Sequence, residues 1–244
     1  MQRYFLKVEY DGSNFCGWQK QNGKRSVQGE IEIALEKLFG EKISVFGSGR
    51  TDAKVHALDQ AVHFDLNCDL PAQNLKLALN DILPIEIAVK KAKKVKSDFN
   101  VRKDIKNKTY LYKLACGYEK DGINGTKITR IKPNLDYEKM LQAKEIFLGK
   151  HNFKGFCSAH AQVKDFEREI YSIDIKKRGK VFLFRLTGNG FLYNMVRIIV
   201  GSLVEVGLGK KTKQDLEEAL KTGNRKLAGQ TLPPQGLYLE KTVY

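Results

Sequence analysis

The sequence predicts an α+β fold made of two lobes with similar strand and helix content. Two observations predict it: runs in which apolar and polar residues alternate occur in both halves of the chain, and amphipathic helical segments lie between them. With 244 residues, the chain can bury a substantial core in either lobe. A lysine-rich stretch over 90–108 is the predicted connection, which gives an N-terminal lobe over 1–104 and a C-terminal lobe over 105–244.

The N-terminal lobe begins with an alternating run over 4–10, which predicts a strand. A helix follows, because Ser26 is placed to cap its start and Gly40 to end it. A second helix is predicted from Asp69 to Pro84, where proline ends it. Further strands are expected over 43–46, 62–66 and 85–89, with a polar, glycine-containing loop over 47–56.

The C-terminal lobe begins with a similar alternation of strand and helix. A strand is predicted over 110–114 and a helix over 136–148. Thr212 and Asp215 have the spacing of a capping box, which opens a last helix that Gly223 ends. Between these lie a predicted hairpin, with strands over 170–175 and 181–186, and an apolar helix over 191–206.

Lysine and arginine outnumber aspartate and glutamate by 43 to 28, a formal charge of +15. This excess favours association with nucleic acid, although a basic protein need not bind one. The four cysteines have no CxxC pair and no zinc-ligand spacing, so we expect no metal and predict reduced, buried thiols. No apolar signal core follows the start, and no apolar run approaches the roughly 20 residues that span a bilayer. We therefore expect a cytoplasmic location and no membrane partner.

The segment FGSGRTDAKVH, residues 46–56, is the strongest candidate for chemistry. It presents Arg50 and Asp52 in alternation, and extended geometry would point both side chains the same way. An arginine beside a carboxylate lowers the pKa of that carboxylate and fixes its rotamer. Spacing alone leaves a surface ion pair in a glycine turn as the alternative. Packing explains His56, in the same segment, better than catalysis does.

Several familiar motifs are missing from the sequence. GxGxxG would need a glycine where Asp52 stands, and no GxxxxGK[ST] phosphate loop occurs. The HxE and PCxxC pattern of zinc deaminases is also missing, as are GxSxG and HExxH. Dinucleotide and nucleoside-triphosphate chemistry therefore lose support.

Five segments in order carry a resemblance to a known family. GSGRTDAKVHA, residues 47–57, resembles the GxGRTDxGVHA signature of the tRNA pseudouridine synthase A (TruA) family. The other four are VEYDGSNFCGWQKQ, KTYLYKL, GFLYNMVRIIVGSLVEVG and GLYLEKTVY. The resemblance runs over nearly the whole chain. It implies the pseudouridine synthase fold, and an enzyme that isomerises uridine to pseudouridine at positions 38 to 40 of the tRNA anticodon arm.

The resemblance also implies roles for single residues. Asp52 corresponds to the essential catalytic aspartate and Arg50 to the arginine of the motif. Tyr110 corresponds to an active-site tyrosine whose ring can stack on the target uracil, although it and Tyr112 could equally be core residues. Arg197 lies on an otherwise apolar helix, where a carboxylate or phosphate partner would offset the cost of its charge. Since Asp52 and Tyr110 fall in different lobes, the active-site cleft is expected between them. The family further implies a homodimer that binds tRNA and needs no cofactor or metal.

One position departs from the signature: Lys54 stands where the family has glycine. If that position requires a positive φ, lysine costs roughly 1 to 2 kcal/mol there. Alternatively, Lys54 contacts an RNA phosphate. Further candidates for phosphate binding are Lys20, Lys24 and Arg25 and the lysines from Lys90 to Lys96, and a solvated charged face is the plain alternative for all of them.

Three other functions stay open at this point. A non-catalytic RNA-binding module would explain the charge and the alternating tyrosines, but would leave Asp52 unused. A pseudouridine synthase that acts at another RNA site would keep the chemistry. A carboxylate-dependent hydrolase would need a second carboxylate or a metal cluster, and the motif contains neither. The sequence also leaves open whether Asp52 acts as a nucleophile or removes a sugar proton.

Overall fold

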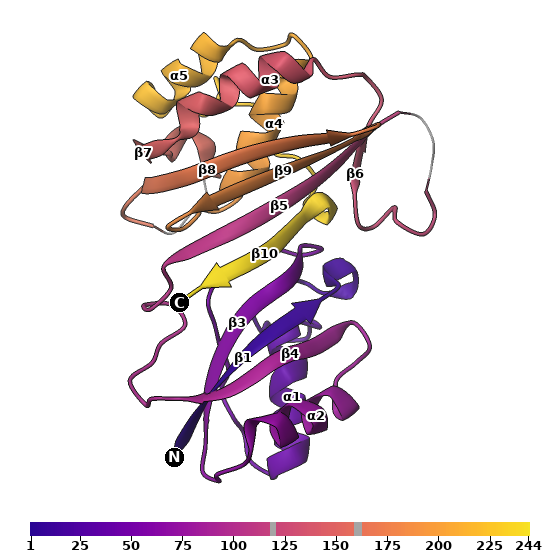
Figure 1. Ribbon diagram of the computed structural model, residues 1–244, viewed down its shortest axis with the longest axis vertical. Helices are drawn as coiled ribbons and strands as arrows, with labels where there is room; N and C mark the ends of the chain where they lie inside the picture. The colour runs from indigo at the N-terminus through magenta and orange to yellow at the C-terminus, as the bar shows by residue number, and fades with distance from the viewer. Residues whose placement is uncertain (118–120, 159–162) are drawn as a thin grey trace. The chain divides into compact units, whose positions relative to one another are not determined.

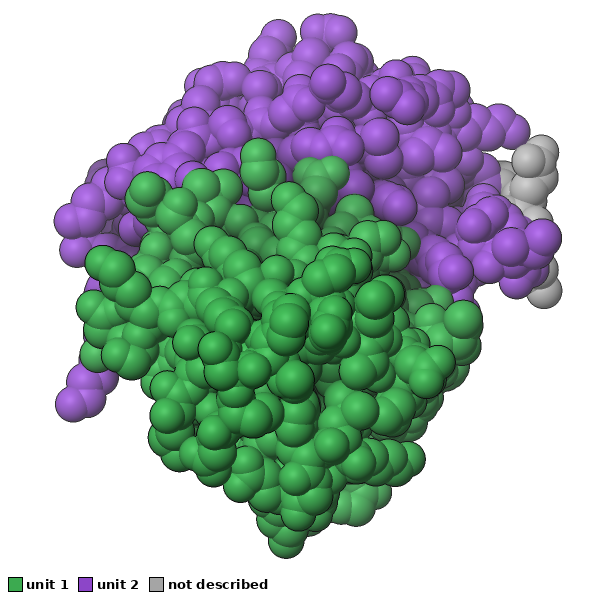
Figure 2. Space-filling model, turned by 60° about the horizontal axis from the view of Figure 1, so that its bottom comes forward, with its two compact units in different colours: residues 1–106, 238–244 green, residues 107–237 purple. Residues whose placement is uncertain are grey.

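A computed structural model describes residues 1–117, 121–158 and 163–244, in which strands and helices are mixed along the chain (Figure 1). The α+β prediction is therefore confirmed. The chain forms two compact units, one over 1–106 and 238–244 and the other over 107–237 (Figure 2). We call them unit 1 and unit 2. The C-terminal residues 238–244 group with unit 1, which the sequence does not indicate.

Unit 1 is built on a sheet in the order β4-β1-β3-β10. β1 (Gln2–Tyr10) pairs antiparallel with β3 (His56–Leu66) and with β4 (Ile87–Val95), while β10 (Leu237–Val243) pairs parallel with β3. The two-residue strand β2 (Phe46–Gly47) joins the sheet beside β3. Helices α1 (Val27–Phe39) and α2 (Ala72–Ile82) lie along this sheet (Figure 1).

The two faces of β1 pack differently because side chains alternate along a strand. Tyr4, Leu6 and Val8 are completely buried on one face. On the other face, Phe5 belongs to a smaller apolar cluster that includes Phe99 and Tyr244. Both faces of the sheet are therefore covered over part of their length.

The predicted helix caps of unit 1 are largely confirmed. The Ser26 side chain accepts the Gly29 N–H at the start of α1, and Gly40 ends the helix with φ 70°. α2 begins after Pro71 without a side-chain cap, so Asp69, which the sequence places at its start, lies outside the helix.

Three expectations for unit 1 are wrong. Of the strand expected over 43–46, only Phe46 is in a strand, because β2 pairs with β3 over just two residues. The lysine-rich connection expected from residue 90 onward is part of β4 as far as Val95, since lysines are common on the edge strand of a sheet. Cys68 is exposed and Cys16 is half-buried, although both were expected to be buried.

In unit 2 the strands are hydrogen-bonded in the order β5-β9-β8-β7, and β6 pairs parallel with β5. The predicted hairpin, the apolar helix and the capping box at Thr212 are confirmed. The strands are β5 (Asn107–Cys116), β6 (Thr129–Ile131), β7 (Gly149–Asn152), β8 (Glu167–Arg178) and β9 (Val181–Gly188). The α-helices are α3 (Tyr137–Lys144), α4 (Met195–Gly207) and α5 (Lys213–Thr222). Short 3-10 helices occur at Gly12–Asn14, Glu145–Phe147, Lys154–Phe156 and Pro234–Gly236.

Among the described residues, no helix is both long and apolar enough to cross a membrane.

Candidate active site

Asp52 lies in the loop that joins β2 to β3, and its backbone is bridged to Gly17 of a preceding segment. The neighbouring residues are anchored in the same way. The Trp18 N–H donates to the Thr51 carbonyl at 3.0 Å, and the Lys54 N–H donates to the Phe15 carbonyl at 3.4 Å. The Asp52 side chain is half-buried. The loop is therefore held by main-chain hydrogen bonds on both sides of the carboxylate.

Two glycines allow this close approach. A Cβ on Gly17 would lie 2.6 Å from the Thr51 carbonyl oxygen, and Gly17 has a φ of +113°, which side-chain-bearing residues rarely adopt. A Cβ on Gly12 would lie 2.0 Å from the Val55 carbonyl oxygen. The segment around residues 11–18, quoted above for its resemblance, thus serves as the support on which the Asp52 loop rests.

Buried side chains also hold the Asp52 loop by hydrogen bonds. The Tyr10 and Thr51 hydroxyls are hydrogen-bonded at 2.7 Å, in a buried position next to Asp52. The Ser48 hydroxyl donates to the Gln60 side-chain oxygen at 2.8 Å, and the Gln60 amide donates to the Gly49 carbonyl at 2.7 Å. Because buried polar groups that are paired also restrict geometry, these contacts keep the loop in one conformation.

His56 closes the loop as a packed residue, as expected. Its Nδ1 accepts the Gly12 N–H at 3.1 Å and lies 3.2 Å from a carboxylate oxygen of Asp11. The imidazole also stacks on Tyr238 with ring centroids 4.6 Å apart. His56 therefore supports the loop.

The ion pair expected between Arg50 and Asp52 is not formed. Arg50 is exposed, and no hydrogen bond or ion pair between these two residues occurs in the described part of the chain. The expectation assumed an extended segment, whereas the chain bends at Ser48 and Gly49 and turns at Ala53 and Lys54. Rigid support for Asp52 comes from the backbone instead.

Lys54 does adopt a positive φ, at +65°. Lysine therefore occupies a left-handed backbone position that favours glycine. The side chain is exposed.

In unit 2, the structure distinguishes the two tyrosines of β5. Tyr112 is completely buried, and its hydroxyl is bonded to the Thr129 hydroxyl at 2.6 Å and donates to the Pro233 carbonyl at 2.7 Å. Burial raises the pKa of Tyr112 well above its ordinary value. Tyr110 is only half-buried, and its ring meets Phe191 edge-on with centroids 5.2 Å apart. Tyr112 is thus a core residue, and Tyr110 keeps part of its ring accessible.

Arg197 is held at the start of α4 by two hydrogen bonds. Its Nε donates to the Leu232 carbonyl at 2.6 Å and its Nη1 donates to the Asn194 side-chain oxygen at 2.6 Å. Asn194 also donates to the Ser158 hydroxyl at 2.8 Å. Two neutral oxygens therefore help to orient the guanidinium, whereas the sequence led us to expect a carboxylate or a phosphate as its partner.

The basic residues proposed for RNA contact differ in their surroundings. Lys20 pairs with Glu32 at 2.9 Å. Arg25 pairs with Glu30 at 2.9 Å and with Glu86 at 3.0 Å, so much of its charge is compensated within the protein. Lys24 and Lys54 are exposed and have no ion pair within the described ranges.

Asp52, Arg50 and Lys54 therefore belong to unit 1, and Tyr110 and Arg197 to unit 2. The sequence reasoning missed the supporting roles of Tyr10, Thr51 and Gly17. Only the glycine offered a signal, since it stands in a turn-rich segment. Within the described part of the chain, no group of three or more His, Cys, Asp or Glu side chains is arranged to hold a metal ion.

A protein family described as tRNA pseudouridine synthase matches residues 7–104 and 143–244. The chain belongs to the tRNA pseudouridine synthase family, whose curated members are isomerases. The family resemblance inferred from the sequence motifs is therefore confirmed.

Full-length relatives carry one name, tRNA pseudouridine synthase A. The protein of Anoxybacillus flavithermus is 42% identical over 245 aligned residues, which cover 100% of this chain and 99% of its own. That of Geobacillus sp. is 43% identical and that of Caldicellulosiruptor bescii 39%, each with 100% of this chain covered and with 98% and 100% of their own. Among solved structures, a chain in the crystal structure of a Cbf5-Nop10-Gar1 complex is similar at a TM-score of 0.41 and 13% identity, with 97% of this chain and 58% of that chain covered.

Proposed function

We propose that this chain isomerises uridine to pseudouridine in the anticodon stem-loop of tRNA, at positions 38 to 40, with Asp52 as its catalytic carboxylate. The observation that carries the proposal is the support of the Asp52 loop. Its backbone is bonded at 3.0 Å and 3.4 Å to the Phe15–Trp18 segment, and Gly17 permits the contact. A carboxylate held in this way meets the reacting sugar or base without reorganising.

The reaction breaks the bond between N1 of uracil and C1′ of ribose, and forms a bond between C5 and C1′. The C5 proton is lost and N1 gains a proton, so atoms and electrons balance without an oxidant or a donated group. Asp52 acts on the ribose, either by attacking C1′ or by removing a sugar proton. The chemistry requires no cofactor or metal.

Other side chains have supporting roles in this proposal. The target uridine leaves its stack, as enzymes that act on a base in folded RNA require. The half-buried Tyr110 ring stacks on the uracil, and Arg197, oriented by Leu232 and Asn194, binds the substrate. Arg50 is exposed, which suits contact of its guanidinium with the RNA backbone or with the space left by the flipped base.

The proposal includes a cytoplasmic enzyme that acts as a homodimer on tRNA. Lys20, Lys24, Arg25 and Lys54 are the proposed phosphate contacts. Of these, Lys24 and Lys54 have the stronger support, because Lys20 and Arg25 are paired with glutamates. The size of the protein in solution tests the dimer.

The deciding experiment maps pseudouridine on an unmodified tRNA transcript incubated in EDTA with wild type, Asp52→Ala or Asp52→Asn. We expect modification in the anticodon arm by wild type only, with tRNA binding retained by both variants. Asp52→Asn is the matched control, because it preserves shape and removes the carboxylate. Tyr110→Phe should retain most activity and Tyr110→Ala should lose it.

Each other result selects a different function. Modification outside the anticodon arm would favour a synthase that acts at another RNA site. Lys54→Gly would then be the first variant to examine. Tight tRNA binding without any modification would favour the RNA-binding module and refute catalysis by Asp52.

A further inference from the structure

A groove in unit 1 is lined by lysines from four different elements. It has a volume of about 670 Å³, and among the described residues no aspartate or glutamate lines it. The remaining lining residues are mainly small or polar, apart from the rings of Phe5 and Tyr244. Its six lysines are Lys7, Lys76, Lys90, Lys91, Lys93 and Lys241, and we call it the lysine groove.

Most of this positive charge is not compensated within the protein. Lys7 pairs with Asp59 at 2.6 Å, and Lys90 pairs with Glu9 at 3.5 Å. The other four lysines of the groove have no ion pair in the described part of the chain. The groove therefore carries a net positive charge that a bound anion would offset.

Lys7 shows how close these charges lie. Its side chain is 12% exposed, and it lies on β1 opposite Lys91 in the register of the sheet. Burial lowers the pKa of Lys7, and the charges of Lys91 and Lys93 lower it further, whereas the hydrogen bond that Lys7 donates to Asp59 raises it. The protein thus tolerates repulsion among like charges here, which an anionic ligand would relieve.

Protection of a sheet edge explains only part of this arrangement. Lysines on an edge strand such as β4 prevent pairing with another chain, which accounts for Lys91 and Lys93. It does not account for Lys7 on an inner strand, for Lys76 on α2 or for Lys241 on β10. Convergence from several elements indicates a binding surface.

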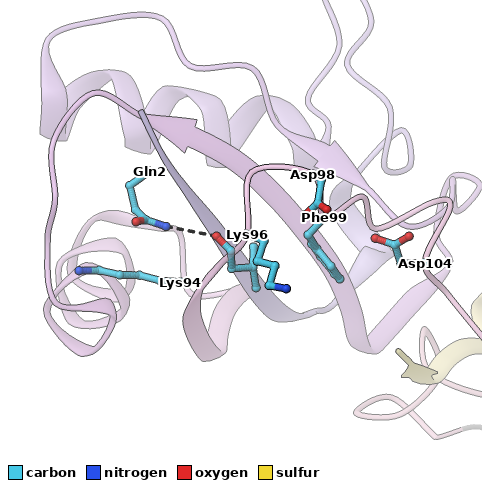
Figure 3. A pocket seen from close by; sticks show the side chains of 7 residues that line it. Gln2, Lys94, Lys96, Asp98, Phe99 and Asp104 are labelled. Atoms are coloured by element: carbon cyan, nitrogen blue, oxygen red, sulfur yellow. Dashed lines mark hydrogen bonds between the residues drawn. The ribbon is translucent and has the colours of Figure 1, made fainter.

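A second cavity in unit 1 provides a contrast (Figure 3). It has about 660 Å³, and there Lys94 and Lys96 stand with Asp98 and Asp104. Lys94 also forms an ion pair with Asp69. Because its charges are mixed, this cavity has no strong preference for an anion, and its lysines serve as a matched control.

The phosphate backbone of RNA is the anion that fits the lysine groove best. Exposed lysine ammonium groups bind phosphate as point charges, and the half-buried Tyr244 ring beside them suits a nucleotide chain. Lys7 lies opposite Ala61 of β3, five residues from His56, where the Asp52 loop ends. At about 3.3 Å per residue, the groove is roughly 16 Å along the strand from that loop.

We propose that the lysine groove binds phosphates of the tRNA substrate at a distance from the nucleotide being isomerised. This inference rests on the proposed function, since it takes the substrate from there. The groove then contributes to affinity for the tRNA and leaves the chemical step unchanged.

The test compares Lys91→Gln/Lys93→Gln with Lys94→Gln/Lys96→Gln, each of which removes two charges from the same region of the chain. Binding of a tRNA transcript is measured from 50 to 300 mM KCl, in an Asp52→Ala background to prevent turnover. Losing two phosphate contacts should lower the slope of log affinity against log salt by about 2, and weaken binding at least about tenfold at 0.1 M salt. Lys241→Gln, on another strand, should lower the slope by about 1.

Kinetics on the wild-type background complete the test. Lys91→Gln/Lys93→Gln should raise KM for tRNA and leave kcat within about twofold. Equal effects of the two double variants would overturn the proposal, as would wild-type binding by Lys91→Gln/Lys93→Gln. If inorganic phosphate or pyrophosphate alone binds the groove while the variants keep wild-type affinity for tRNA, the groove is a site for a small anion. That result would also overturn the proposal. Failure of wild type to form pseudouridine would refute the proposed function, while the binding data would still decide the groove.

Discussion

Replacing Lys54 by glycine should stabilise the protein, although it removes a whole side chain. Lys54 has a φ of +65°, is exposed, and forms no ion pair in the described residues. A left-handed conformation costs a residue with a Cβ about 1 to 2 kcal/mol. Glycine avoids that strain but loses about 0.5 to 1 kcal/mol more in conformational entropy on folding. The expected net gain is about 0.5 to 1 kcal/mol, or about 1 to 4 °C in Tm for a chain of this size.

The assay is thermal and urea unfolding of wild type, Lys54→Gly and Lys54→Ala. The alanine variant removes the amine but keeps the Cβ, so its stability should match that of wild type. If alanine stabilises as much as glycine, the gain comes from removing a charge in a protein of net charge +15, and the strain argument is refuted. A loss of stability in Lys54→Gly would refute it as well.

The same two variants test the alternative role of Lys54 as a phosphate contact. If the amine binds RNA, both variants should raise KM for tRNA equally and lower the salt slope of binding by about 1. Stability that changes only with glycine, together with affinity that changes with both variants, would assign the backbone and the side chain separate roles.

Three further predictions concern single contacts within unit 1. Gly17→Ala should cost about 2 to 4 kcal/mol in chemical denaturation, because its Cβ would lie 2.6 Å from a carbonyl oxygen at a φ of +113°. A Gly17→Ala protein as stable as wild type would show that the loop can move away freely. Tyr10→Phe should cost about 1 to 2 kcal/mol and lower kcat, since it leaves the buried Thr51 hydroxyl without its 2.7 Å partner; unchanged kcat would limit Tyr10 to folding. Glu86→Gln should cost about 1 kcal/mol at pH 7. The hydrogen bond from Arg25 lowers the pKa of Glu86 from 4.5 to about 2, so its contribution is complete above pH 4.5 and lost as the pH falls toward 2. The variant and wild type should therefore converge in acid, and a constant difference down to pH 2 would contradict this.

Local rules predicted the helices well. Ser26 caps the start of α1 and Gly40 its end, and Thr212 forms the capping box of α5 with Asp215. These caps could be predicted because a cap depends on residues close in sequence. The strands were harder, since a strand needs a partner that the sequence does not name. Residues 90–95 lack apolar alternation and are nevertheless a strand, because β1 provides the pairing.

In the candidate site too, features set by residues close in sequence could be predicted, and features set by long-range contacts could not. The motif alone identifies Asp52 and the unusual Lys54. The loop bends, however, so the alternation that predicted a pair between Arg50 and Asp52 does not apply. The contact of Tyr10 with Thr51 joins residues 41 positions apart, and no local pattern contains it. Long-range contacts of this kind follow from the docking of the loop on the Gly12–Trp18 segment, which only the folded chain shows.

Backbone strain in the described residues coincides with the proposed site. Lys54 and Asn194 are the two non-glycine residues with positive φ there, at +65° and +60°. One follows Asp52 by two positions, and the other binds the Arg197 guanidinium through its side chain at 2.6 Å. Such strain persists only where surrounding contacts outweigh it, and each residue has them: main-chain bonds hold the Asp52 loop, and Asn194 is tied to Ser158 as well as to Arg197. Each unit therefore stabilises a costly turn beside one side chain of the proposed site, which is what positioning a charged group in advance of the substrate requires.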